Sequence, residues 1–231
     1  TYSMAETKTV NRPVQHQPET TDRTQDFWSQ YSRPITIALA AILLLVVGYF
    51  AYKKFIQEPK EAKASEAIFK AEDYYRMDSL NLALNGDGIN PGFVKIADQY
   101  SGTKAGNLAK FYAGAAFLQT GDAAKAAKYL DDFETDAKQV QARAYKLLGD
   151  AQSEQGKNKE ALSNYKKAAK HFESDEANAS DYLFMAAYFA DRVMKDQKQA
   201  IELFTELKNK YPRSEKGFEA EKYLAQLGSY K

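Results

Sequence analysis

The longest apolar stretch of the chain runs from Pro34 to Tyr52 and contains no charged residue. As an α-helix rising about 1.5 Å per residue it would extend roughly 28 Å, close to the roughly 30 Å hydrocarbon core of a bilayer. Aromatic residues flank this stretch on both sides, as expected at membrane interfaces. The pattern predicts one transmembrane helix over residues 34–56, with interfacial anchors at Trp28, Tyr31, Tyr49 and Tyr52.

Two other kinds of segment can contain an apolar stretch of this length, a cleaved signal peptide and a helix buried in a soluble core. A cleaved signal peptide has a shorter apolar region close to the N-terminus and a small-residue cleavage site. Here about 33 mostly polar residues come first, and the stretch ends in aromatic residues and Lys53-Lys54, which favours an uncleaved signal anchor. The second alternative, a helix buried in a soluble core, is disfavoured by the length of the uncharged stretch.

Polar residues dominate the segment before the apolar stretch. Residues 1–25 are rich in Thr, Gln and Glu and show no apolar periodicity. Such a composition buries too little apolar surface to offset the conformational entropy of an ordered chain. We therefore predict that residues 1–33 form a disordered tail.

After the apolar stretch, residues from Lys53 to about Leu84 show helical spacing, with Pro59 as the one break near the start. A segment dense in turn-forming residues, 85–92, predicts a loop. It lacks the alternating oxygen ligands and distal glutamate of a calcium loop. No metal site is predicted there.

From Phe93 onward the pattern indicates helical hairpins with a period near 35 residues, which is typical of tetratricopeptide-type repeats. A third, degenerate copy follows at an offset of 39, in which Lys195 replaces the turn glycine. The first glycine of each pair and the alanine after the turn allow the two helices to approach closely, and the second glycine supplies the turn. The matching positions are Gly114, Gly121, Ala126 and Leu130, then Gly149, Gly156, Ala161 and Tyr165, then Phe184, Ala200, Phe204 and Pro212.

The repeats predict an all-α fold, in which a tetratricopeptide-like domain over residues 57–231 forms an α-solenoid of about four hairpins and a capping helix. The opening hairpin would pair residues 60–84 with residues 93–99, and the capping helix would cover residues 214–227 with Ser214 as its N-cap. Bulky residues would fill the space between hairpins, namely Phe117, Leu130, Tyr145, Tyr165, Phe184 and Phe204.

Composition narrows the possible functions. The 32 basic and 31 acidic residues leave a net charge of +1, which gives no electrostatic reason to expect nucleic acid as a partner. Cysteine is absent, so disulfides and cysteine-ligated metals are excluded. The two histidines, His16 and His171, lie in no catalytic motif, and there is no phosphate-binding loop. We therefore predict a protein that is not an enzyme and uses no cofactor.

Stacked hairpins present the first helix of each pair to a concave groove, which is suited to an extended or partly unfolded polypeptide. For any one aromatic residue, packing between repeats is an equally good alternative. Tyr182 and Phe189 are expected to be the most open. The predicted groove residues are Leu108, Phe111, Ala115, Leu118, Arg143, Lys146, Asp150, Tyr182, Met185, Phe189 and Arg192.

The architecture resembles the YfgM family of bacterial inner-membrane proteins. The resemblance runs from Asp26-Phe27-Trp28 through the apolar stretch to the alanine-rich segment Ala62–Tyr75, and the repeats extend it to the C-terminus. It implies an ancillary subunit of the Sec translocon that acts with the membrane-anchored chaperone PpiD on emerging secretory proteins. It also implies an N-terminus in the cytoplasm and repeats in the periplasm.

The charges that flank the apolar stretch favour the opposite orientation. Arg23 and Arg33 precede it, whereas four lysines follow within about 11 residues. Long domains, however, translocate largely regardless of flanking charge, so we keep the periplasmic orientation. Two other functions are possible: a scaffold that docks one subunit of an envelope complex, and a cochaperone adaptor. The adaptor would need Lys and Asn where this chain has Phe111 and Ala115, which disfavours it.

Overall fold

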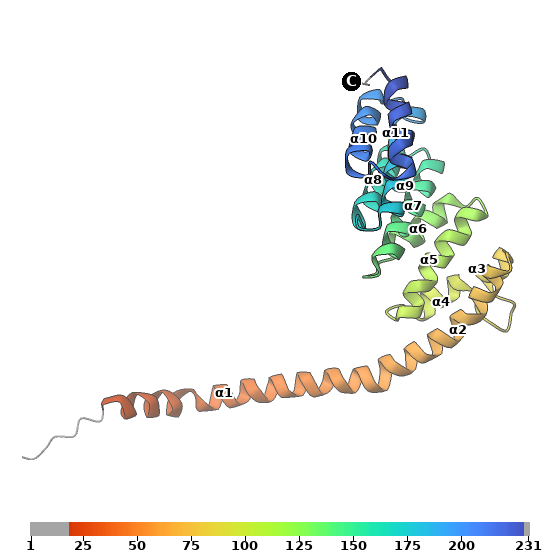
Figure 1. The fold of residues 1–231 in the computed structure, drawn as a ribbon. Helices are drawn as coiled ribbons and strands as arrows, with labels where there is room; N and C mark the ends of the chain where they lie inside the picture. Colours follow the sequence, from red (N-terminus) through yellow and green to blue (C-terminus); the bar gives the residue numbers. More distant parts are fainter. Residues whose placement is uncertain (1–18, 229–231) are drawn as a thin grey trace, which may run out of the picture. The chain divides into compact units, whose positions relative to one another are not determined.

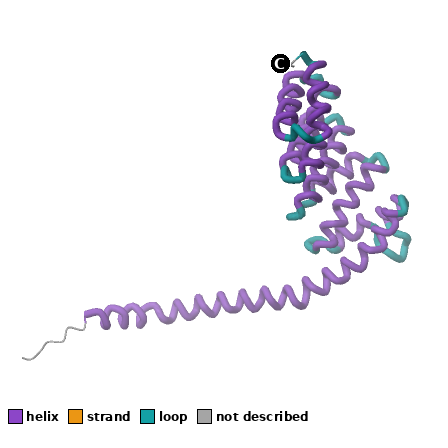
Figure 2. The backbone as a smooth tube through the Cα atoms, viewed as in Figure 1, coloured by secondary structure: helices purple, strands orange, loops and turns teal. Residues whose placement is uncertain are grey.

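The structure is a computed structural model that describes residues 19–228. The chain divides into two compact units, residues 1–55 and residues 56–231. Within the described residues the chain forms helices and loops and no strand (Figure 2). The first unit contains the predicted membrane helix, and the second contains the repeats.

The first unit is dominated by α1 (Glu19–Tyr52). This helix begins before the apolar stretch, so residues 19–33, which the sequence places in a disordered tail, are helical in the structure. Once a helix is nucleated in the apolar stretch, each added residue contributes one backbone hydrogen bond, which favours extension into the polar segment. The predicted disorder of residues 1–18 and the side chain of Trp28 lie outside the described residues.

The apolar part of α1 is long and apolar enough to span a membrane. Mean hydropathy reaches 2.4 over 18 residues, and none of that window is buried by protein. Leu44 and Leu45 are 73% and 74% exposed, and Tyr31, Tyr49 and Tyr52 are exposed at its edges. Apolar side chains on every side of an unpacked helix require a partner other than water. These features fit a membrane-spanning helix better than a helix of a soluble core.

The second unit is a stack of helices that continues the chain through successive antiparallel pairs (Figure 1). The pairs α5/α6, α7/α8 and α9/α10 follow one another, and α11 packs on α10. The predicted α-solenoid with a capping helix is thereby confirmed. The elements are a π-helical turn at Lys53–Gln57, α2 (Glu58–Arg76), α3 (Leu80–Asn85), α4 (Phe93–Gln99), α5 (Lys104–Gln119), α6 (Ala123–Asp131), α7 (Lys138–Glu154), α8 (Asn158–His171), α9 (Glu176–Arg192), α10 (Gln197–Lys210) and α11 (Glu215–Gln226).

The opening hairpin differs from the prediction, because the helix expected to reach Leu84 breaks into α2 and α3. Asp78 adopts a left-handed conformation with φ +57°. The N–H of Ser79 donates to the Tyr74 carbonyl (2.9 Å) and that of Asp78 to the Tyr75 carbonyl (3.1 Å). This hydrogen-bond pattern ends a helix, and aspartate tolerates the left-handed region better than most residues. Periodicity alone does not reveal such a break.

The start of α2 is fixed to the turn between α4 and α5. The Glu61 carboxylate accepts hydrogen bonds from the backbone N–H groups of Lys104 (2.7 Å) and Ala105 (3.0 Å). It therefore supplies acceptors to two N–H groups at the beginning of α5 that have no partner within that helix. Two further bonds reach the same turn, from Lys60 Nζ to the Ser101 carbonyl (2.6 Å) and from Gln57 Nε2 to the Gly102 carbonyl (2.8 Å).

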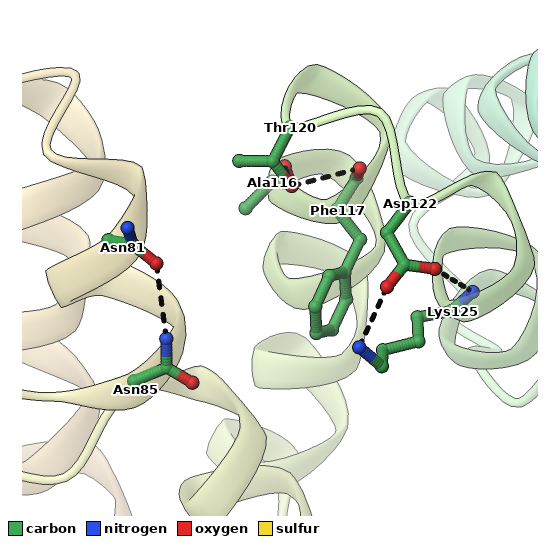
Figure 3. Close-up of polar contacts among 7 residues, drawn as sticks. All are labelled: Asn81, Asn85, Ala116, Phe117, Thr120, Asp122 and Lys125. Carbon is green, nitrogen blue, oxygen red and sulfur yellow. Dashed lines mark hydrogen bonds and ion pairs between the residues drawn. The ribbon is translucent and has the colours of Figure 1, made fainter.

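The turn from α5 to α6 illustrates how a hairpin closes (Figure 3). Gly121 has φ +81°, and the Thr120 hydroxyl donates to the Ala116 and Phe117 carbonyls. The Asp122 carboxylate accepts from the N–H of Lys125 (3.0 Å) and pairs with its ammonium (2.7 Å), which caps α6. The predicted role of the second glycine is confirmed, since Gly156 in the next hairpin also has a positive φ.

The first glycine of each pair lies where two helices approach closely. A Cβ atom on Gly114 would lie 2.5 Å from Leu130 Cγ, and one on Gly149 would lie 2.6 Å from Tyr165 Cε1. Both distances are far below van der Waals contact, so no larger residue fits without displacing a neighbour. Ala126 and Ala161 are completely buried across from them.

The turn from α9 to α10 contains one more residue than the turns from α5 to α6 and from α7 to α8. The N–H of Asp196 donates to the carbonyl of Ala190, six residues earlier, whereas the N–H of Lys157 donates to Gln152, five residues earlier. Consequently, equivalent positions in α7 and α9 lie 38 residues apart. The predicted offset of 39 applies only to positions after the turn, in α8 and α10. The buried counterpart of Gly149 is Ala187. The predicted offset of 39 pairs Phe184 with Tyr145, and this pairing is therefore wrong by one residue.

Lys195 occupies the left-handed position in this longer turn, with φ +57°. A non-glycine residue costs roughly 1–2 kcal/mol there, whereas glycine loses about 0.5–1 kcal/mol of backbone entropy. We expect Lys195→Gly to raise the free energy of unfolding by about 0.5–1 kcal/mol in urea titrations. Gly156→Ala, at the equivalent turn, should lower it by about 1 kcal/mol. Equal effects of the two substitutions would contradict this explanation.

Most of the residues predicted to fill the space between hairpins do so. Phe117, Leu130, Tyr165 and Phe204 are buried, whereas Tyr145 and Phe184 are half-buried. The core consists of two clusters of buried residues, one from α2 to α7 and one from α8 to α11. Polar contacts lie between them, including Tyr165 Oη to Asp150 (3.0 Å) and Asn164 Nδ2 to Gln152 (2.7 Å).

The loop between α3 and α4 is organised by Asp87. Its carboxylate accepts from the backbone N–H groups of Ile89 (2.8 Å) and Asn90 (2.6 Å) and from the Tyr74 hydroxyl (2.7 Å). These bonds, with one from the Asn90 side chain, hold the pKa of Asp87 well below its usual range. The predicted loop is confirmed over residues 86–92, whereas Asn85 is the last residue of α3, and Gly86 and Pro91 form a β-bridge within the loop.

Because the pKa of Asp87 is lower in the folded than in the unfolded state, its contribution to stability is present above pH 4 and is lost as pH falls. We expect the thermal midpoint of the wild-type protein to fall more steeply below pH 4 than that of Asp87→Asn. Parallel curves for the two proteins between pH 5 and pH 2 would show that the loop does not depend on the Asp87 carboxylate.

Candidate protein-binding face

The predicted groove residues of the first clear repeat are mostly packed inside the domain. Phe111 is only 7% exposed, and its ring contacts that of Phe133 at a centroid distance of 5.3 Å. Ala115 is buried, and Leu108 and Leu118 are partly buried against the same core. The alternative in which these residues pack between repeats is therefore correct for α5.

Phe189, expected to be among the most open residues, is 6% exposed and packs edge-on against Tyr165 with ring centroids 5.2 Å apart. Tyr182 is half-buried beside Ala142 of α7 and Phe172, and Met185 is partly buried as well. The expectation that Phe189 lies in an open groove is wrong. The cause is the extra residue in the turn after α9, which shifts the register by one position.

The middle of the predicted groove is charged, as expected from the sequence. Arg143 is exposed and lies over the ring of Phe111 at 6.0 Å. Lys146 and Asp150 form an ion pair of 2.6 Å, and Asp150 also accepts the hydroxyl hydrogen of Tyr165. Burial and the nearby carboxylate of Asp150 raise the pKa of Tyr165, so its hydroxyl stays a donor. These side chains form a polar face on α7.

One repeat further along, the corresponding positions are aromatic. Phe184 of α9 contacts Tyr188 of the same helix, Tyr223 of α11 and the fully buried Phe204 of α10. We call these four residues the aromatic cluster. Tyr223 stacks on Phe204 at 4.9 Å and meets Tyr188 edge-on at 6.0 Å. Tyr188 is 43% exposed, so the cluster reaches solvent. It links the last hairpin to the capping helix.

Two cations lie over the faces of these rings. The Arg192 guanidinium is 5.9 Å from the Tyr188 ring and 6.0 Å from the Tyr223 ring, and Lys216 Nζ is 4.9 Å from the Phe184 ring. The hydrogen bond from Lys216 to Glu219 raises the pKa of the lysine, so it stays charged at neutral pH. Both cations are also paired with carboxylates, Arg192 with Asp191 (2.9 Å) and Lys216 with Glu219 (3.1 Å). The cluster thus offers apolar surface bordered by two ion pairs.

A family model described as "Tetratricopeptide repeat-like domain" matches residues 25–144. The matched residues cover slightly more than half of the 231-residue chain. The chain belongs to the tetratricopeptide repeat-like family. The match includes the apolar stretch as well as α2 to α6. A search of curated proteins found no match.

In this tetratricopeptide repeat-like protein, the sequence analysis did not identify Tyr188 and Tyr223 as candidate binding residues. It placed Phe184 only in the space between hairpins. The available signal was the apolar pattern of α9 itself. Its buried residues Ala186 and Ala187 repeat Leu148 and Gly149 of α7 at an offset of 38. Aligning the repeats on that pair would have placed the open aromatic residue at position 188.

The chemistry of the described residues fits binding. They contain no group of three or more His, Cys, Asp or Glu side chains that could hold a metal ion. The ring of His171 lies edge-on to Tyr145, with ring centroids 5.5 Å apart. Repeat domains of the tetratricopeptide type are typically protein-binding modules.

Proposed function

We propose that this protein is a membrane-anchored module that binds extended or partly unfolded protein segments. The observation that carries the proposal is the aromatic cluster with its two cations, exposed at Tyr188. Aromatic side chains combine large apolar area with few rotatable bonds, and they dominate many protein interfaces. The adjoining helices of a solenoid offer such side chains in a row, which matches an extended chain.

More specifically, we propose that the protein is a chaperone-like accessory of the Sec translocon in protein export. It rests on the resemblance to the YfgM family, and the family match that joins the apolar stretch to the repeats is consistent with it. On this proposal the protein crosses the bacterial inner membrane once, with a cytoplasmic N-terminus and periplasmic repeats. Its partners are the translocon, a PpiD-like membrane-anchored chaperone, membrane lipid and nascent secretory proteins.

A second candidate function is a scaffold that docks one specific subunit of an envelope complex. The observation that favours it is the polar face of α7, where Arg143 is exposed and Lys146 pairs with Asp150. Fixed charges at an interface select one partner by complementarity more than they add affinity. A scaffold would bind one folded subunit and discriminate little among unfolded chains.

A substitution in the aromatic cluster separates these functions. Tyr188→Asp places a carboxylate beside exposed aromatic surface, and we expect it to weaken binding of a permanently unfolded chain at least tenfold. The probe is labelled α-casein, titrated against the full chain in lipid nanodiscs and followed by fluorescence anisotropy. The matched control is Phe69→Asp, because Phe69 of α2 is also an exposed aromatic residue, at 61%.

The control variant should bind within twofold of the wild-type protein. Equal weakening by both substitutions would show that the aromatic cluster has no special role. Failure of the wild-type protein to bind casein, with retention of one folded envelope protein, would favour the scaffold instead.

A further inference from the structure

A second surface of the repeat domain, on α8, has a different chemistry from the aromatic cluster. A hollow of about 780 Å³ lies between α8, Tyr145 of α7 and the turn that leads into α10. Four lysines of α8 line it, at successive intervals of seven, one and three residues. They are Lys159, Lys166, Lys167 and Lys170.

These four lysines have no acidic partner. Within residues 31–228, for which side chains are described, none of them lies within 4 Å of a carboxylate. Lys167 lies over the ring of Tyr145 at 5.7 Å. Asp196 is the acidic residue among those that line the hollow, and its carboxylate already accepts the N–H of Gln199 at the start of α10. Asp196 keeps its negative charge when it accepts this hydrogen bond, so the four lysines leave the lining of the hollow with a net positive charge.

The interior of the hollow is apolar. Leu162 is 4% exposed, and the partly buried side chains of Tyr145 and Met194 lie beside it. An apolar interior surrounded by ammonium groups fits a ligand with negative charges on both sides of an apolar side chain. Lys159 and Lys170 are eleven residues apart on α8, which places their Cα atoms about 16 Å apart along the helix. One phosphate group cannot reach both, whereas about five residues of extended chain can.

We infer that this hollow is a docking site for an acidic polypeptide segment of about five residues with an apolar side chain among its carboxylates. Charge complementarity and the spacing of the lysines carry the inference. A bilayer fits less well, because a flat lipid surface cannot reach Leu162 at the bottom of a hollow. The site is separate from the aromatic cluster and does not depend on the function proposed above.

The test uses the full chain in nanodiscs of neutral phosphatidylcholine and a labelled peptide of sequence Glu-Glu-Leu-Glu-Glu-Phe. We expect saturable binding at low ionic strength that weakens steadily as salt is raised, because the contacts are between exposed charges. The triple variant Lys159→Glu, Lys166→Glu, Lys170→Glu should lower the affinity at least tenfold. The control variant Lys63→Glu, Lys95→Glu, Lys222→Glu changes the net charge equally at exposed lysines elsewhere and should stay within twofold.

Several results would overturn the inference. The first is that a peptide with glutamine in place of each glutamate binds as tightly as the acidic peptide. The second is that the two triple variants lose the same affinity. The third is that phosphatidylglycerol vesicles bind through these lysines while the peptide does not bind. Tyr188→Asp should leave binding of the acidic peptide unchanged, so failure at one surface is distinguishable from failure at the other. Far-UV circular dichroism shows whether each variant keeps its helices.

Discussion

Phe204→Ala should lower the free energy of unfolding of the repeat domain by about 4 kcal/mol. Phe204 is fully buried in α10 and contacts both Phe184 and Tyr223 of the aromatic cluster. Removing a buried phenyl ring typically costs about 3–5 kcal/mol, because apolar transfer energy is lost and a cavity remains. Domains of this kind are stable by only about 5–15 kcal/mol, so the loss is a large fraction of the total. Urea titration followed by far-UV circular dichroism measures it.

The matched control for this substitution is Phe218→Ala on α11. Phe218 is 64% exposed, so its removal should change the free energy of unfolding by no more than about 0.5 kcal/mol. The unfolding of Phe204→Ala should begin in α9 to α11, because repeats in a solenoid are stabilised by their neighbours. Similar losses for the two substitutions would contradict the packing of α10 described here.

Two arginines in the middle of the apolar stretch should release the protein from membranes. Leu44 and Val47 of α1 are 73% and 56% exposed. Each arginine at the centre of a membrane helix costs about 2.5–3.5 kcal/mol on insertion scales, so Leu44→Arg with Val47→Arg costs about 6 kcal/mol. We expect the double variant to be extracted by alkaline carbonate, whereas the wild-type protein stays with the membrane pellet.

The control places the same two charges on the repeat domain. Phe69→Arg with Met77→Arg changes an exposed apolar residue of α2 and the exposed residue that follows its last turn, and should leave the protein in the pellet. Release of both double variants would mean that arginine substitution itself causes extraction. Retention of both would show that α1 is not the membrane anchor.

Much of the fold follows from periodic features of the sequence. The glycine and alanine positions of the first two clear repeats are fixed by close approach, since a Cβ on Gly114 or Gly149 would overlap the side chain of the facing helix. Ser214 caps α11 as predicted, accepting a hydrogen bond from the N–H of Gly217 at 2.9 Å. Features of this kind are local, so a pattern within one hairpin is enough to reveal them.

What the sequence could not predict depends on single backbone conformations. The left-handed Asp78 splits a helix that periodicity treats as continuous. The extra residue before Lys195 shifts α9 by one position, which buries Phe189 and exposes Tyr188. Because neighbouring positions on a helix point about 100° apart, one residue of register decides which aromatic side chains reach solvent. The expectation that Phe189 is open is therefore wrong, although the repeat itself was found and Arg192 of the same helix lies over the ring of Tyr188.

The most direct test of the proposed function is photocrosslinking from position 188 in intact membranes, with a light-activated amino acid in place of Tyr188. The account predicts adducts with many different secretory chains, which disappear when protein synthesis is stopped. The same probe at position 189, which is buried, should give few adducts. A single adduct with one folded protein, unchanged when synthesis stops, or equal adducts from both positions would contradict the account.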